Sequence, residues 1–195
     1  IFFYIKNIKT KEIWSSSYNK YIDNTDTYTI KFMPDQDEIE RTDGDIKTKV
    51  KITTTPNDSV EIRRLELENT GKNEEILEVS SYFEPILSKK EDDYAHQAFN
   101  NLFLITEYDY EKNNLIIKRK ARGKNSQDIY LATQLFTDCE IIGENEFEID
   151  KEKFIGRGNL GIPKMIQQSI PFSKKIGLVT EPIVAMKKTI KINPG

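Results

Sequence analysis

The chain has few of the residues that build disulfides, metal sites and catalytic centres. Its 195 residues include one cysteine (Cys139), one histidine (His96) and one tryptophan (Trp14). A single cysteine excludes an internal disulfide and a zinc site made of cysteines, and it is typical of a reducing compartment such as the cytoplasm. A single histidine leaves no second imidazole to share a metal ion. We therefore expect neither a metal nor another cofactor.

The chain also lacks an excess of charge of one sign and a long apolar run. It has 29 basic and 32 acidic residues, for a formal net charge of −3. Without a basic field to hold a polyanion, nucleic acid is not an expected partner. The opening stretch IFFYI is too short to span a bilayer and is interrupted by Lys6, so it is expected to be a core or edge strand.

Length and aromatic content favour one folded domain over residues 1–195. Apolar residues make up 37% of the chain and include ten Phe and nine Tyr, which is enough to fill a core. A β-sandwich of this size is common as a single domain. The chain has no initiator Met and ends in Asn193-Pro194-Gly195 directly after an apolar strand. This predicts a fragment of a longer, multidomain protein.

Helical periodicity is almost absent, and alternation dominates. No stretch keeps an apolar period of 3.6 residues for a dozen positions, and only Asp150–Phe154 resembles a helix, of one turn with Asp150 as its N-cap. Tyr28–Phe32 and Ile46–Ile52 alternate apolar with polar residues, and the second carries lysines on its polar face. Asp43-Gly44 predicts a hairpin turn. The chain is therefore predicted to be all-β, as a sandwich or a barrel.

One strand contains a change of phase. Val60 and Ile62 alternate in one register, whereas Leu65 and Leu67 belong to the other, and a one-residue bulge near Arg63-Arg64 would reconcile them. The further strands expected are Ile76–Phe83, Leu102–Tyr108, Leu115–Ala121, Ile129–Phe136, Glu146–Ile149, Gly177–Met186 and Thr189–Ile192.

The stretch FIGRGNLG, residues 154–161, has the G-x-G-x-x-G spacing of a dinucleotide-binding turn, and Glu181 follows at about the distance of a ribose-binding acid. Such a turn needs a parallel strand before it and a helix after it. Here a short helical segment precedes the glycines, and Pro163 and Pro171 follow them. We therefore expect glycines that allow a tight turn or a close approach, with Arg157 projecting from the bend.

A second unusual segment is Ser88–Asn101, which is predicted to be a long loop. It contains aromatic and amide side chains, the types that stack on and hydrogen-bond to sugars. The alternative for His96 is a structural histidine, because neither a nucleophile nor a metal partner accompanies it. Trp14 is either a core residue or a sugar platform, and the basic run Lys118–Lys124 is either a solvated strand end or a phosphate or domain contact. Cys139 is interpreted as a packing residue.

Several segments together resemble one enzyme family. In chain order they are Ile13-Trp14-Ser15, Arg41-Thr-Asp-Gly-Asp45, Val60-Glu-Ile-Arg-Arg-Leu65 with Asn69, Ser81-Tyr82, Ala95-His-Gln-Ala-Phe-Asn-Asn-Leu-Phe103, Phe154-Ile-Gly-Arg-Gly158 and Glu181-Pro-Ile183. The ordered set is similar to the β-sandwich domain of the family 94 glycoside phosphorylases, formerly counted as glycosyltransferases of family 36. Within that family it resembles most the cyclic β-1,2-glucan synthases and 1,2-β-oligoglucan phosphorylases.

The resemblance implies a large two-sheet antiparallel β-sandwich, a supersandwich similar to that of galactose mutarotase, with minimal helix. In such enzymes the sandwich precedes an (α/α)6 barrel that carries the catalytic acid, and inorganic phosphate attacks a β-glucosidic bond. The resemblance therefore assigns no catalytic residue to this chain. It implies a non-catalytic domain of a larger hexosyltransferase, itself cytoplasmic or associated with the inner membrane.

The resemblance also implies partners and contact residues. The expected partners are the (α/α)6 catalytic domain, a β-glucan oligosaccharide and, through the sandwich, a second copy in a homodimer. The candidate carbohydrate or domain contacts are His96, Phe99, Asn100, Asn101, Arg157 and Asn159. Two alternatives stay open: an autonomous carbohydrate-binding module for β-glucans, and an independent enzyme of the mutarotase type, for which one histidine is a poor supply.

Overall fold

The computed structural model of the chain describes residues 2–19, 25–121, 123, 126–157 and 161–195. These residues belong to two compact units. The first comprises Ser80–Asp138 and Gly143–Lys188, and the second comprises Phe2–Val79, Cys139–Ile142 and Thr189–Gly195. The boundaries cross two long strands, so that both β7 and β13 contain residues of each unit.

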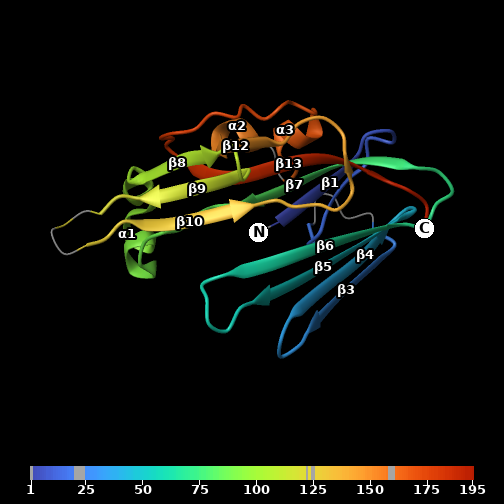
Figure 1. Cartoon of the computed structure of the whole chain (residues 1–195), viewed down its shortest axis with the longest axis horizontal. Helices are drawn as coiled ribbons and strands as arrows, with labels where there is room; N and C mark the ends of the chain where they lie inside the picture. The colour runs from blue at the N-terminus through green and yellow to red at the C-terminus, as the bar shows by residue number, and fades with distance from the viewer. Residues whose placement is uncertain (1, 20–24, 122, 124–125, 158–160) are drawn as a thin grey trace. The chain divides into compact units, whose positions relative to one another are not determined.

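The described part of the chain forms strands and three short helices (Figure 1). The helices are α1 (Lys90–Asn101), α2 (Lys151–Ile155) and α3 (Lys164–Gln167). The strands are β1 (Phe2–Asn7), β2 (Ile13–Ser15), β3 (Thr27–Phe32), β4 (Asp37–Asp43), β5 (Ile46–Thr54), β6 (Glu61–Asn69), β7 (Glu75–Phe83), β8 (Leu104–Asp109), β9 (Asn114–Arg119), β10 (Ile129–Gln134), β11 (Glu140–Ile141), β12 (Glu146–Asp150) and β13 (Pro182–Ile192).

These strands pair into sheets of six, four and three strands over the described residues. The six-stranded sheet has the order β11-β13-β7-β1-β2, with β12 also on β13. The smaller sheets have the orders β3-β4-β5-β6 and β10-β9-β8, and their neighbouring strands are antiparallel. The predicted all-β antiparallel fold is confirmed. None of the described helices is long and apolar enough to cross a membrane.

The four-stranded sheet of the second unit shows the predicted hairpin and the predicted lysine face. The β4–β5 turn contains Gly44 at φ 55°, a conformation that glycine adopts without strain. On one face of the sheet, lysines of β5 pair with carboxylates of the neighbouring strands. The pairs are Lys49–Glu38 at 3.0 Å, Lys47–Glu40 at 3.4 Å and Lys51–Glu66 at 3.0 Å.

The bulge predicted near Arg63-Arg64 is wrong. The β5–β6 register runs without a shift from Ile46↔Asn69 to Thr54↔Glu61. Ile62 therefore lies on the lysine face, where half of its surface stays exposed. The phase change is tolerated because β6 is an edge strand, whose end can leave an isoleucine in solvent more cheaply than it can lose ladder hydrogen bonds.

Two of the segments that carry the family resemblance meet in the interior of the second unit. Arg41 is 1% exposed; its Nε and Nη2 donate to the Asp43 carboxylate, and its Nη1 donates to the Ser15 carbonyl at 2.8 Å. Trp14 is 3% exposed, and its indole N–H donates to Thr48 Oγ1 at 3.0 Å. Trp14 is thus a core residue and not a sugar platform.

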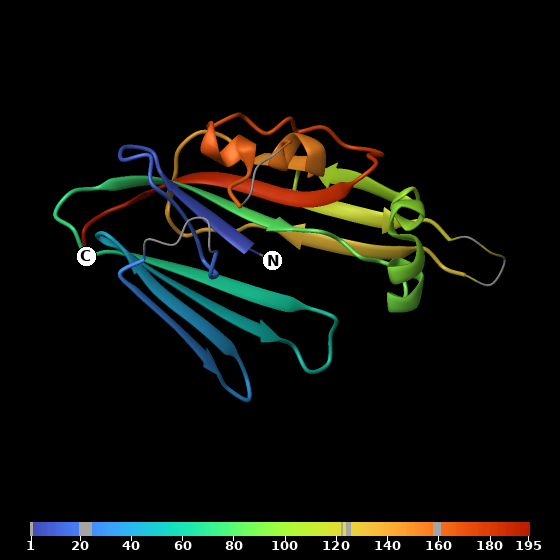
Figure 2. The ribbon, with the colours of Figure 1, turned by 180° about the vertical axis from the view of Figure 1, so that it is seen from behind.

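The core of the first unit lies between β8–β9, β12 and β13 (Figure 2). Its buried members are Leu104, Leu115, Ile117, Phe147, Ile149, Val184 and Met186. The members from β9, β12 and β13 are alternate residues of their strands, so one face of each strand supplies this core. Phe147 stacks on Tyr108 with their ring centroids 4.2 Å apart.

Three sequence expectations differ from the structure in this unit. The segment predicted to be a long loop is mostly helix α1, and a second helix absent from the prediction, α3, follows the glycine-rich stretch. The two strands predicted at Gly177–Met186 and Thr189–Ile192 are one strand, β13, which begins at Pro182 and continues into the second unit. Helix α1 was not predicted because it has no apolar stripe. Its one buried residue, Asn100, is polar.

Candidate contact surface on helix α1

Helix α1 is held in place by polar contacts and exposes most of its side chains. Glu91, Asp92 and Asp93 occupy its first turn, where carboxylates interact favourably with the helix dipole. Tyr94 is 85% exposed and Phe99 is 46% exposed, whereas Asn100 is 4% exposed. A short amphipathic helix normally buries an apolar face, so the exposure of both rings is unusual.

The helix contains a kink at His96, whose φ of −150° and ψ of 56° are not helical. The side chain of Asn100 spans this kink. Its Nδ2 donates to the Asp92 carbonyl at 2.7 Å, in the first half of the helix, and to the His96 carbonyl at 3.1 Å. The Asn100 amide thus joins the two halves where the regular backbone ladder is interrupted.

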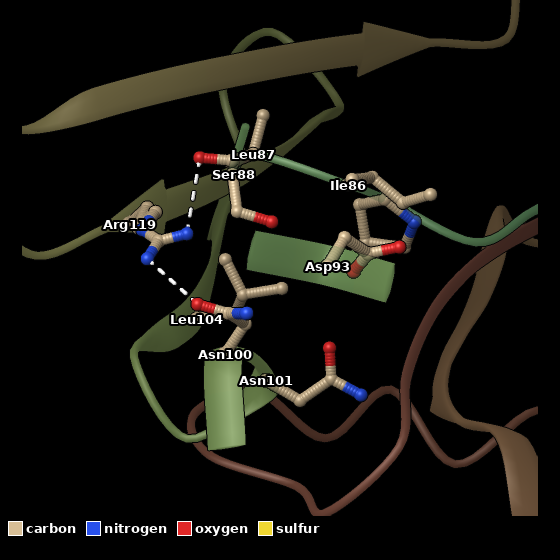
Figure 3. A pocket seen from close by; sticks show the side chains of 9 residues that line it. Ile86, Leu87, Ser88, Asp93, Asn100, Asn101, Leu104 and Arg119 are labelled. Atoms are coloured by element: carbon tan, nitrogen blue, oxygen red, sulfur yellow. Dashed lines mark hydrogen bonds between the residues drawn. The ribbon is translucent and has the colours of Figure 1, made fainter. Parts of the chain in front are cut away.

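Arg119, on β9, completes the attachment. Its Nη2 donates to Asn100 Oδ1 at 2.9 Å, and its Nη1 donates to the Leu87 carbonyl at 3.3 Å. Figure 3 shows the Arg119 guanidinium turned toward both oxygens. We call four hydrogen bonds the α1 clamp: Arg119 donates to the Leu87 carbonyl and to Asn100 Oδ1, and Asn100 Nδ2 donates to the Asp92 and His96 carbonyls. The clamp ties the helix to the three-stranded sheet and to the segment that precedes it.

The space that adjoins the clamp is too narrow to admit a water molecule. It is lined by Pro85, Ile86, Leu87, Ser88, Asp93, Asn100, Asn101, Leu104 and Arg119. In Figure 3 the Asn101 amide lies away from the Arg119–Asn100 pair.

The sequence-predicted residues that the structure describes lie in two separate places. His96, Phe99, Asn100 and Asn101 lie on α1, so the structure brings these four together. Arg157 follows α2, which Figure 1 places apart from α1.

Two of the predicted residues differ from the rest. Asn159 lies outside the described residues. Asn100 makes hydrogen bonds within the chain, to its own helix and to Arg119.

The glycine-rich bend is a structural turn. Asp150 caps α2 through its Oδ1, which accepts from Glu152 N at 3.1 Å, as predicted. Gly156 then adopts φ 75°, and a Cβ built there would lie 2.8 Å from Lys164 Cβ of α3. The tight turn and the close approach expected of these glycines are both present at Gly156. Arg157 projects from the bend, 92% exposed, with its guanidinium 3.1 Å from Glu152 Oε1.

The surroundings of the bend do not match a dinucleotide site. The strand before it, β12, pairs antiparallel with β13, and the helix after it, α3, has only four residues. Over the described residues, no group of three or more His, Cys, Asp or Glu side chains is arranged to hold a metal ion.

Comparison with known proteins identifies the family. The family model described as the supersandwich domain of glycosyl hydrolase 94 matches residues 1–195. The chain belongs to the glycosyl hydrolase 94 supersandwich family. It is also 25% identical over all 195 residues to the cyclic β-(1,2)-glucan synthase NdvB of Rhizobium meliloti (strain 1021). The chain spans 7% of the length of that synthase.

The role of Arg119 in attaching α1 was not predicted from the sequence of this supersandwich domain. The run Lys118–Lys124 was interpreted as one feature, but alternation separates its first members. Arg119 occupies the same phase as Leu115 and Ile117, both fully buried, so it points toward the core and needs partners there. A charged residue in the inward phase of a strand was the signal that could have found it.

Lys118, in the outward phase of the supersandwich strand β9, is also engaged. Its Nζ lies 2.7 Å from Asp128 Oδ2 and 5.3 Å from the centre of the Tyr130 ring. The hydrogen bond to Asp128 raises the pKa of Lys118, and the same bond, with a second from the Ala121 N–H, lowers the pKa of Asp128. The first two residues of the basic run therefore make internal contacts, and Arg122 and Lys124 lie outside the described residues.

Proposed function

We propose that this chain is a non-catalytic supersandwich domain of a larger enzyme that makes or phosphorolyses β-glucan. The observation that carries the proposal is the match of the whole chain to a 7% portion of a cyclic β-(1,2)-glucan synthase. A domain that forms so small a part of such a relative is expected to act with the rest of its parent protein. We propose an (α/α)6 catalytic domain as its partner in that parent.

The exposed surface of α1 supports this role. Tyr94, Phe99 and Leu102 are 85%, 46% and 58% exposed. Apolar side chains exposed in a group mark contact surfaces more often than free surface. The α1 clamp holds Asn100 inward, and the rings of Tyr94 and Phe99 stay exposed on the same helix. We propose that they contact the catalytic domain, or the glucan where it enters that domain.

This division of labour is consistent with the chemistry proposed for the parent. Inverting phosphorolysis needs one carboxylic acid to protonate the leaving oxygen, while phosphate takes the place of the attacking water. We assign that acid to the helical domain. The supersandwich then contributes binding energy and wall surface, which affect how substrate is held and not the proton transfer itself.

The test uses the full-length parent enzyme with substitutions on α1 and a matched control. His96→Ala and Phe99→Ala should each lower kcat/KM for glucan phosphorolysis or synthesis by about tenfold, which corresponds to the loss of one good contact. Tyr110→Ala is the control. Tyr110 is 70% exposed and packs edge-on against Tyr108 at 4.9 Å, as Phe99 does against Phe103 at 5.3 Å.

The control should leave kcat/KM unchanged, and all three variants should keep the melting temperature of the parent. Equal activity of the Phe99 and Tyr110 variants would contradict a contact role for α1. An activity loss that follows the loss of folded protein would instead make these residues structural.

A second candidate function is an autonomous carbohydrate-binding module for β-glucans. It is favoured by one observation: α1 places an exposed aromatic, Tyr94, on the same short helix as His96 and Asn101, and these are the side-chain types that stack on and hydrogen-bond to sugars. Titration of the 195-residue chain with β-1,2- and β-1,4-gluco-oligosaccharides by calorimetry or NMR separates the two. Binding at millimolar affinity or tighter indicates the module, and no binding indicates the supporting domain.

A further inference from the structure

We infer that Asn100 and Arg119 are positioning residues: they set the orientation of α1 and act on any partner only through the helix. This inference rests on the proposed function for its biological consequence, because α1 is the proposed contact surface. Its structural content stands on the α1 clamp alone and is measured separately.

Helix α1 buries very little of its own surface. Asn100 is the buried residue of the helix, and the residues on either side of it, Phe99 and Asn101, are exposed or half-buried. A helix of twelve residues without a buried apolar face gains little from packing and is marginal on propensity alone. The attachment of α1 therefore depends on the clamp to an unusual degree.

The Asn100 side chain both donates and accepts hydrogen bonds. One amide donates to two carbonyls, of Asp92 and His96, and accepts from Arg119. An aspartate at this position would keep the acceptor but could not donate to either carbonyl while ionised. It would place a carboxylate oxygen against two carbonyl oxygens. Only the amide supplies both donors here, so an aspartate would lose the two bonds that span the kink.

Position 119 uses two separate nitrogens of an arginine side chain. The planar guanidinium reaches the Asn100 amide with one nitrogen and the Leu87 carbonyl with another. A lysine has a single nitrogen at the end of a flexible stem and cannot reproduce this fork. Arg119 therefore sets the distance between the helix and the segment before it, whereas a lysine would keep only one of the two bonds.

The experiment measures hydrogen exchange by mass spectrometry in peptides that cover residues 90–101. Asn100→Asp and Arg119→Lys should each raise exchange in α1 by about tenfold or more, since a local opening costs less when clamp bonds are lost. Exchange in β9 and β12 should stay at the level of the unsubstituted chain. Unchanged exchange in α1 would overturn the inference, as would an equal rise in β9 and β12.

Asn69→Asp is the matched control. Asn69 is 3% exposed, and its Nδ2 donates to the Asn73 carbonyl at 2.7 Å, but it lies at the end of β6 in the other unit. This variant should leave exchange in α1 unchanged. A rise in α1 exchange in the Asn69 variant would mean that the helix responds to general destabilisation, and would overturn a specific role for the clamp.

The link to function is tested in the parent enzyme by a double-mutant cycle between Asn100→Asp and Phe99→Ala. If Asn100 acts by positioning the surface that contains Phe99, the two losses in kcat/KM should be strongly non-additive. Additive losses would overturn the positioning role. If α1 exchanges faster but activity stays at the wild-type level, the clamp does hold the helix, and the proposed contact surface is refuted. Failure of the inference and failure of the proposed function can therefore be distinguished.

Discussion

Substitution of Gly156 by alanine tests why the glycine-rich bend contains glycine. Gly156 ends α2 with φ 75° and ψ 165°, a backbone conformation that L-residues rarely adopt. Holding a residue with a side chain there costs about 1–3 kcal/mol. This part of the cost comes from the backbone and is independent of the neighbours.

The close approach of α3 adds a second cost. The new methyl group would lie 2.8 Å from Lys164 Cβ and 2.9 Å from Lys164 Cδ. The Cβ of Lys164 cannot swing away, because it is bonded to the backbone of a helix whose next residues, Met165 and Ile166, are buried. Relieving such an overlap costs about 1–3 kcal/mol. Gly156→Ala should therefore lower the free energy of unfolding by about 2–6 kcal/mol.

Gly143→Ala provides the matched control. Gly143 has a similar φ of 81°, but an added Cβ would meet no atom within 4 Å. Urea unfolding of both variants, followed by far-UV circular dichroism, gives the two free energies by linear extrapolation. Gly156→Ala should cost about 1–3 kcal/mol more than Gly143→Ala. If it costs the same or less, the bend does not need glycine for the approach of α3, and the packing argument is refuted.

Two further predictions concern charged residues. Arg41→Ala should lower the free energy of unfolding by about 3–5 kcal/mol, because it leaves the Asp43 carboxylate and the Ser15 carbonyl without their buried partner; an effect below about 1 kcal/mol in urea unfolding, the size of a surface pair, would contradict this. The carboxyl carbon of Asp128 should titrate by NMR below the ordinary aspartate value of about 3.9, because the Lys118 ammonium holds its pKa down. Because the folded-state pKa is lowered, the Asp128–Lys118 pair stabilises the fold at pH values above the unfolded pKa. That stabilisation is lost as the pH falls through the folded pKa. A titration midpoint at or above the ordinary value would exclude a stabilising contribution from this pair.

Features that depend on a few adjacent residues were predictable. Asp43-Gly44 forms its hairpin turn because glycine relieves the strain of positive φ whatever surrounds it. Asp150 caps α2 because a short carboxylate reaches the N–H groups two and three residues later. The lysine face of β5 follows from strict alternation, which places every second side chain on one side of a sheet.

Features that depend on distant partners were not predictable in the same way. Helix α1 forms from a segment without apolar periodicity, and it is attached by Arg119, which lies 19 residues beyond Asn100 in the chain. The phase change at Ile62 predicted a bulge, whereas the regular register that β5 imposes left that residue exposed. In both cases local preference was outweighed by hydrogen bonds to another element.

The sequence by itself determined the all-β class, the main strands and the family, because alternation, turn residues and an ordered set of short segments can be read along one dimension. Only the tertiary structure decided which polar side chains are used up internally. Asn100 was predicted to contact carbohydrate or a neighbouring domain; within the chain its amide joins the two halves of a kinked helix and accepts from Arg119. The physical reason is that a buried polar group must find its partners wherever the fold places them, and sequence spacing does not contain that distance.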